Sequence, residues 1–215
     1  MGTSRRAKEG GLRIGGDAQN RTGDGGFADL CLTTWLRRRQ AFELDSTFGL
    51  TAPYACDRMA RQAFLDVMAR VPAGVVLVST RSGDDYKALT ASSLVSISVE
   101  PPLVLVGLEH DSATRSAILE TRAFNVSVLT RSQEFIADRF AGRAPAMDPK
   151  WSTLPHRLGK NGIPLLDGAA AWLECRVTDT HRAGDHDVCI GEVDAAEVGS
   201  GDPLVLWDRQ FWTLH

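Results

Sequence analysis

The sequence lacks the features that mark a membrane protein or a nucleic-acid-binding protein. None of its apolar runs approaches the roughly 18 residues that a membrane-spanning helix requires. Its formal net charge is only -3 at pH 7, and its 24 basic residues are interspersed with 27 acidic ones. It therefore has no basic surface of the kind that binds nucleic acid. These absences favour a small molecule as the partner, with no nucleic acid and no membrane.

Cysteine is scarce and shows no pattern that binds a metal or builds a disulfide framework. The chain has four cysteines, with neither CxxC nor Cys/His spacing: Cys31, Cys56, Cys175 and Cys189. A chain of 215 residues with 43% hydrophobic content can build a core without disulfide bonds. We therefore predict reduced thiols in a cytoplasmic protein. The five histidines also lack metal-ligand spacing, so no metal site is predicted.

The first 58 residues differ in composition from the rest of the chain. They are rich in Gly, Arg and Asp and have no apolar period, which predicts a disordered N-terminal extension over 1–58. Two interpretations of this extension stay open: a regulatory tail, or read-through upstream of a natural start at Met59. In either case we expect one folded domain over 59–215.

From Met59 onward the pattern predicts a mainly β domain with short helices. A first helix, with an apolar face of Ala60, Phe64, Val67 and Met68, must end before Pro72. Short helices are expected over 111–121 and 130–140, and an irregular excursion over 141–164. Strands are expected over 75–80, 86–99, 103–108, 123–129, 169–180 and 186–198, followed by a closing segment over 203–215. Without a regular βαβ alternation, an antiparallel barrel, closed or nearly closed, is the most economical architecture.

An unusual set of hydroxyl groups lies within the expected strand 86–99. Five fall within nine residues: Thr90, Ser92, Ser93, Ser96 and Ser98. Strict alternation places Val95, Ile97 and Val99 on one face, which we expect to enter the core. Such a strand is either a solvated polar strand or a site where N–H and O–H donors meet a planar heteroaromatic ligand.

Residues 74–108 are similar to the flavin reductase-like branch of the FMN-binding split-barrel proteins. Their sequence is GVVLVSTRSGDDYKALTASSLVSISVEPPLVLVGL. Further matches follow in the family's order: DSATRSAI, FNVSVL, DRFAGR, and GDH with IGEV. The resemblance covers about residues 62–215 and implies an antiparallel split β-barrel with short inserted helices that forms a homodimer. The sequence departs from the pattern at Ala88, where a glycine is frequent, and around Trp207–Trp212, where a tyrosine is expected.

The resemblance also implies a set of cofactor-binding residues. Thr90, Ala91, Ser92 and Ser93 would line the ring edge and ribityl chain of FMN or FAD, and Ser112 and Thr114 the phosphate. His186 would position the nicotinamide of NADH or NADPH. The helix-end motif adds Phe140 to the cofactor-binding set. Arg115, Arg139 and Arg143 are candidates for pairing with phosphate.

The implied function is an NAD(P)H:flavin oxidoreductase that supplies reduced flavin to a partner monooxygenase. No protein acid or base is required, because the two cofactors carry the hydride chemistry. Two alternatives stay open: a split-barrel oxidase or oxygenase that keeps its flavin and acts on an organic substrate, and a non-catalytic flavin- or haem-binding module. The GDH hairpin favours the reductase, since a passive binder needs no nicotinamide site.

Overall fold

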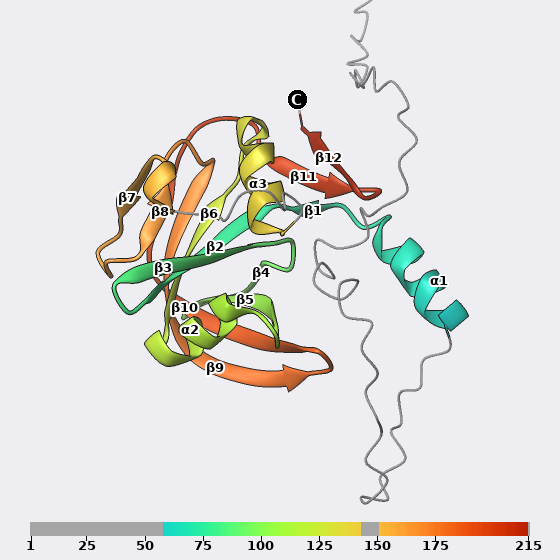
Figure 1. Ribbon diagram of the computed structural model, residues 1–215, viewed down its shortest axis with the longest axis horizontal. Coiled ribbons are helices and arrows are strands. Elements are labelled where there is room, and N and C mark those ends of the chain that lie inside the picture. Colours follow the sequence, from blue (N-terminus) through green and yellow to red (C-terminus); the bar gives the residue numbers. More distant parts are fainter. Residues whose placement is uncertain (1–57, 143–150, 215) are drawn as a thin grey trace, which may run out of the picture.

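The computed structural model describes residues 58–142 and 151–214. The predicted disordered extension therefore lies outside the described residues, except for its last position. The largest element is a seven-stranded antiparallel sheet in the order β3-β2-β6-β9-β10-β5-β4, which curls around the core (Figure 1). Its strands are β2 (Val76–Ser82), β3 (Asp85–Ala91), β4 (Val95–Val99), β5 (Pro102–Glu109), β6 (Ala123–Val128), β9 (Ala171–Ala183) and β10 (His186–Val198).

Smaller elements surround this sheet. A three-stranded sheet in the order β1-β11-β12 lies at the C-terminal end of the chain, and β7 pairs with β8. Their bounds are β1 Ala73–Gly74, β7 His156–Leu158, β8 Pro164–Leu166, β11 Leu204–Trp207 and β12 Gln210–Thr213. The helices are α1 (Arg58–Met68), α2 (Ala113–Thr121) and α3 (Glu134–Phe140), with single turns η2 (Arg131–Gln133) and η3 (Trp151–Thr153). The predicted fold class, a mainly β antiparallel split barrel with inserted helices, is confirmed.

Strand β2 is buried on both faces, which explains its continuous apolar sequence. Val76 and Val78 belong to the core inside the curved sheet, together with Phe124 at the centre of that core. Val75 and Leu77 pack on the opposite side, in a second core with α3 and Trp151. Because both faces of the strand are covered, both sets of alternating side chains are apolar.

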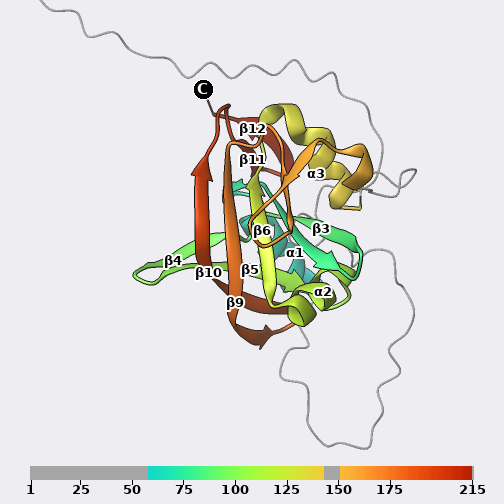
Figure 2. The same ribbon diagram turned by 90° about the vertical axis from the view of Figure 1, so that its left-hand side faces the viewer.

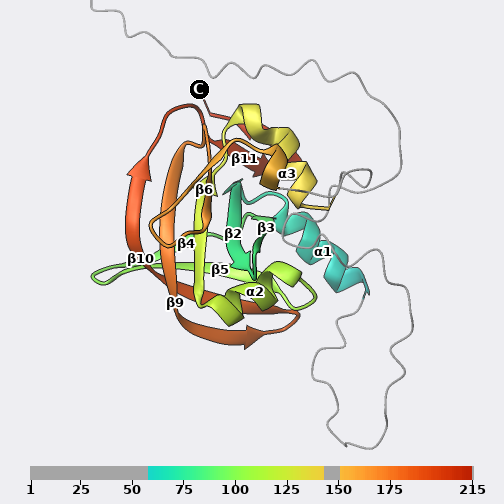
Figure 3. The ribbon, with the colours of Figure 1, turned by 60° about the vertical axis from the view of Figure 1, so that its left-hand side comes forward.

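The expected strand 86–99 is wrong as a single element. It is two strands, interrupted at residues 92–94: β3 pairs with β2, whereas β4 pairs with β5. These two strands form opposite edges of the seven-stranded sheet. Residues 92–94 therefore lead from one edge of the sheet to the other. The sheet is curled, and β3 and β4 do not pair with each other (Figure 3).

The expectation that Val95, Ile97 and Val99 enter the core is also wrong. Their side chains are exposed on β4, and the turn between β4 and β5 projects from the body of the protein (Figures 2 and 3). A register shift interrupts the pairing between Ser96 and Ser98, so the simple alternation read from the sequence does not hold there.

The first helix is confirmed, but its apolar face is not covered by the rest of the chain that the structure describes. Phe64, Val67 and Met68 are exposed, and α1 lies beside the barrel instead of within a packed layer (Figure 1). No helix in residues 58–142 and 151–214 is long and apolar enough to cross a membrane.

The remaining local predictions agree with the structure with small changes. Ser112 is the N-cap of α2, and Thr130 with Gln133 forms a capping box at the start of η2. The β9–β10 hairpin turns at Gly184, whose φ of 66° suits glycine. The described part of the predicted irregular excursion holds the single turn η3 and also the β7–β8 hairpin, which the sequence reasoning missed.

Candidate functional site

The main cavity, about 620 Å³ in volume, lies where β3, β5, α2, the end of α3 and the tip of the β9–β10 hairpin meet. Both α2 and the hairpin tip stand at the same end of the barrel in Figure 1. Seven of the eight residues predicted to bind cofactors line this cavity: Thr90, Ala91, Ser93, Ser112, Thr114, Phe140 and His186. Ser92 is not among its lining residues. Segments that are up to about a hundred residues apart in sequence thus share one cavity.

Gly107 forms part of the cavity floor. Its strand neighbours Val106 and Leu108 are fully buried in the core, so the Gly107 position faces the other side of β5, toward the cavity. The Gly107 N–H donates to Ser93 Oγ at 3.0 Å. A Cβ at this position would lie 3.3 Å from Ser93 Oγ and 3.8 Å from His186 Cδ2. The missing side chain therefore keeps space open between Ser93 and His186.

Thr90 and Phe140 join the cavity to α3. The Thr90 hydroxyl donates to the Ala137 carbonyl at 2.8 Å, so it holds the helix against β3. Phe140 is 8% exposed and its ring packs against Trp151, with centroids 5.9 Å apart. These two residues form a fixed wall on this side of the cavity. The hydrogen of the Thr90 hydroxyl is already donated to the Ala137 carbonyl.

The N-terminal end of α2 supplies the polar end of the cavity. Ser112 caps the helix by accepting a hydrogen bond from the Arg115 N–H at 3.4 Å, and Thr114 in the first turn is 4% exposed. The first N–H groups of a helix lack partners within the helix and form a partial positive charge. This end of the cavity is suited to a phosphate group.

His186 lies at the start of β10, where it pairs with Glu109 at the end of β5. Its Nδ1 lies 2.7 Å from Oδ1 of Asp185, which also lines the cavity. The hydrogen bond with His186 is the main reason that the pKa of Asp185 is held below its usual range. The carboxylate therefore fixes the orientation of the imidazole ring and leaves Nε2 available to a ligand.

The three arginines predicted as phosphate partners differ in what the structure shows of their contacts. Arg115 is held by Asp187, with Nε and Nη2 at 2.6 and 2.5 Å from Oδ2. Arg139 is 8% exposed and donates to Thr153 at 3.3 Å. Arg143 lies outside the described residues. Both described arginines are therefore engaged with protein groups, and phosphate pairing by the arginines stays a prediction.

Sequence reasoning missed several lining residues, among them Gly107, Phe64 and Met68. Gly107 had a readable signal, because an isolated glycine inside an apolar strand marks a close approach. Phe64 and Met68 had none, since an apolar helix face ordinarily indicates core packing.

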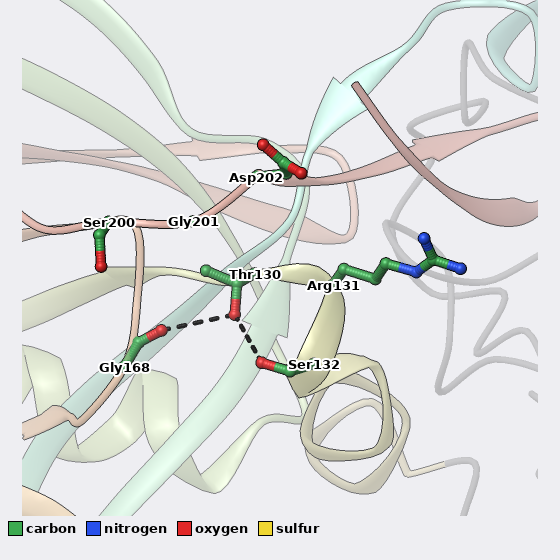
Figure 4. Close-up of a pocket in the computed structure, with 7 residues that line it drawn as sticks. All are labelled: Thr130, Arg131, Ser132, Gly168, Ser200, Gly201 and Asp202. Atoms are coloured by element: carbon green, nitrogen blue, oxygen red, sulfur yellow. Dashed lines mark hydrogen bonds between the residues drawn. The ribbon is translucent and has the colours of Figure 1, made fainter. Parts of the chain in front are cut away.

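A second hollow of about 520 Å³ shares no lining residue with the main cavity and lies at Thr130, Gly168 and Gly201 (Figure 4). The Thr130 hydroxyl is engaged with Ser132 and with the Gly168 carbonyl, at 3.1 and 3.4 Å. Figure 4 shows the Arg131 side chain directed away from this hollow. Because none of the predicted site residues lines this second hollow, we place the functional site in the main cavity. Within the described ranges, no cluster of three His, Cys, Asp or Glu side chains has the arrangement of a metal site.

Residues 68–215 match the family described as flavin reductase like domain. The chain belongs to this family. The resemblance of the 74–108 segment and the motifs after it to flavin reductases is thus confirmed.

Three relatives show what this chain is similar to. The reductase component of 4-hydroxyphenylacetate 3-monooxygenase from Thermus thermophilus is 33% identical, with 72% of this chain and 97% of the relative covered. The actinorhodin polyketide dimerase of Streptomyces coelicolor is 40% identical over 69% of this chain and 84% of the relative. The solved NADH:FAD oxidoreductase of Streptomyces globisporus, in complex with NAD and FAD fragments, has a TM-score of 0.67 and 30% identity; the match covers 74% of this chain and 95% of that one.

Proposed function

We propose that the protein is an NADH-dependent flavin reductase that reduces FMN or FAD. The observation that carries the proposal is the convergence of the hydroxyl-bearing end of β3, the N-terminal end of α2 and His186 on one cavity. The cavity size lies within the range of small-molecule sites, about 300–1,000 Å³. Relatives that use NADH and flavins support the same chemistry.

The residues fit a flavin in a definite order. The ring system would lie over Gly107 and beside Ser93, where the missing side chain leaves room. The ribityl phosphate would meet the N–H groups at Ser112–Thr114, which offer hydrogen bonds and a partial positive charge. Phe140 and Ala91 would supply the apolar wall, and the set from the sequence analysis, including Ser92 at the end of β3, remains the proposed flavin-binding group.

The nicotinamide would enter from the side of His186. Hydride transfer from the nicotinamide to the flavin is chemistry that the two cofactors supply themselves. The protein positions the rings against each other, which removes the entropic cost of a two-molecule encounter. His186, oriented by Asp185, would hold the dinucleotide or stabilise negative charge in the site.

We further propose that reduced flavin passes to an oxygenase partner. The relatives include reductase components of two-component systems, which provide flavin to a second enzyme. Residues 59–215 would form the reductase domain. Its reduced, buried thiols and its use of NADH suit the cytoplasm.

A homodimer is the proposed assembly. Val95, Ile97 and Val99 on β4 are 51%, 44% and 89% exposed, an unusual concentration of apolar surface on an edge strand. The apolar face of α1 is exposed as well. Light scattering on the purified full chain tests this: a mass twice that of the 23.3 kDa chain supports it, and a monomer at all concentrations contradicts it.

The reductase activity is tested by mixing the full-length protein with NADH and either FMN, FAD or riboflavin, and following the absorbance of reduced nicotinamide. We expect oxidation of NADH that depends on both protein and added flavin. Loss of the nicotinamide band at the same rate without flavin, or no loss with any flavin, overturns the proposal. NADPH in place of NADH measures the selectivity for the dinucleotide.

A second function is favoured by one observation, the 40% identity with a relative named for polyketide dimerisation. A protein of that kind would act on an organic substrate and keep its flavin. Gel filtration after loading with flavin separates the two: a reductase that uses flavin as a substrate loses it readily, whereas an enzyme with a resident flavin elutes coloured.

A further inference from the structure

A buried carboxylate stands directly behind the proposed nicotinamide residue. Asp187 follows His186 in β10, and successive side chains of a strand point to opposite faces. His186 lines the cavity, whereas Asp187 is 4% exposed and lies on the core side of the strand. A charged group at such a position is stable only when its oxygens are hydrogen-bonded.

Both oxygens of Asp187 hold the segment that leads into α2. Oδ1 lies 2.9 Å from Nε2 of His110, in the turn between β5 and α2. Oδ2 accepts from Nε of Arg115, in the first turn of α2, at 2.6 Å. One carboxylate therefore binds the chain at His110 and at Arg115, on either side of residues 111–114. All four of these residues line the main cavity.

A backbone contact strengthens the same connection. The His110 N–H donates to the Asp185 carbonyl at 3.0 Å. Burial alone would raise the pKa of Asp187, but the hydrogen bonds from Arg115 and His110 outweigh it and hold that pKa below its usual value. The carboxylate is thus ionised near neutral pH, and the hydrogen bonds it accepts are charge-assisted and short.

We propose that Asp187 is a positioning residue that sets the preference of the enzyme for flavins with a 5′-phosphate over riboflavin. It holds the phosphate-binding end of α2 at a fixed place relative to the hairpin that carries His186. This inference rests on the proposed function, because it assigns a specificity to that same site.

The physical reason is that the N–H groups of a helix end act on a phosphate only when they converge on one point. Arg115 is already neutralised by Asp187, so its contribution to phosphate binding is to anchor the helix. Loosening this anchor spreads the positions of Ser112 and Thr114. Riboflavin has no phosphate to lose contact with, so its binding does not depend on the anchor.

The test compares FMN with riboflavin in Asp187→Asn, which keeps the shape of the side chain and removes its charge. We expect the KM for FMN to rise about 10-fold or more, the size of a lost charged hydrogen bond, with the KM for riboflavin changed by less than about 2-fold. Equilibrium dialysis without NADH should give the same shift in the ratio of the two flavin dissociation constants. The control is Asp179→Asn, an exposed aspartate of the same hairpin that pairs with exposed His181.

A second variant keeps the proposal testable where Asp187→Asn does not fold. His110 is partly exposed, with 24% of its side chain accessible, and His110→Ala removes one of the two anchors. It should shift the FMN-to-riboflavin ratio in the same direction by a smaller factor. A folded variant at either position that keeps the wild-type ratio overturns the inference, as does loss of the fold in both. Wild-type protein inactive with every flavin overturns the proposed function instead.

Discussion

The Gly107 N–H donates to the Ser93 hydroxyl at 3.0 Å, and a methyl group on Gly107 would press against that same oxygen. The pair connects β5 to the corner that follows β3, at the floor of the main cavity. Because the sheet is not joined between β3 and β4, this contact helps to keep the opening at a fixed width. Space at Gly107 is therefore a requirement of the proposed flavin site.

Gly107→Val should fill this space and raise the KM for FMN. We expect a rise of about 10-fold or more, because misfit of even one methylene in a binding pocket costs about 1–3 kcal/mol. Equilibrium dialysis with FMN measures the loss of binding. The control is Gly74→Val, where an added Cβ meets nothing within 4 Å. Unchanged FMN binding in a folded Gly107→Val protein would show that the flavin ring does not lie over Gly107.

His186→Ala should raise the apparent KM for NADH about 10-fold, the size of one lost hydrogen bond to a charged or dipolar partner. The KM for flavin should change much less, because the proposed phosphate contacts at the start of α2 do not include His186. His181→Ala is the matched control, since His181 is exposed on the same hairpin and pairs with Asp179. Steady-state kinetics at saturating flavin provides the measurement, and equal effects on both KM values would argue against a nicotinamide role.

The stability of the protein should fall on acidification, in part through Asp187. Its pKa in the folded state is below the ordinary value of 3.8. The stabilisation is therefore fully present above the unfolded value and is lost as the pH falls through the folded pKa. Urea unfolding at a series of pH values between about 5 and 3 should show a steep loss for the wild type and a shallower one for Asp187→Asn. The same slope in both proteins would contradict this assignment.

Cys175 and Cys189 should resist alkylation in the native protein. Burial raises the pKa of Cys175 to about 12 and that of Cys189 to about 11, so almost no reactive thiolate forms near neutral pH. Iodoacetamide treatment followed by peptide mass spectrometry should leave both unmodified without denaturant and modify both in urea. Rapid native labelling of either residue would show that the core opens on the time scale of the reaction.

Local sequence predicted much of the fold because neighbouring residues decide it. Ser112 caps α2 by a hydrogen bond three residues away, and Gly184 allows the β9–β10 hairpin to turn. The apolar run at 75–78 indicated a buried strand, and β2 is covered on both faces. For the cap and the turn, the determining contact or conformation lies within the segment itself, and for β2 the apolar pattern of the segment indicates that both faces are covered.

Residues 86–99 show where that reasoning stops. The segment has a continuous strand-like pattern, yet β3 and β4 pair with different strands at opposite edges of the sheet. Which partner each half takes depends on how the whole sheet curls, and no local propensity encodes it. The exposed face of Val95 and Ile97 follows from the same cause, since no other element in the described part of the chain covers it.

The sequence by itself determined most of the strands, the short helices and the family, because these follow from local pattern and ordered motifs; the cofactor-binding residues stay a prediction. The tertiary structure alone decided that Gly107 opens the cavity floor, that Arg115 is bound to Asp187, and that this carboxylate also holds His110. The contacts of Asp187 join residues more than 70 positions apart, and Gly107 meets Ser93 across 14 positions. They exist only because β5, α2 and β10 meet at one end of the barrel, where burial compels a charged group to find its partners.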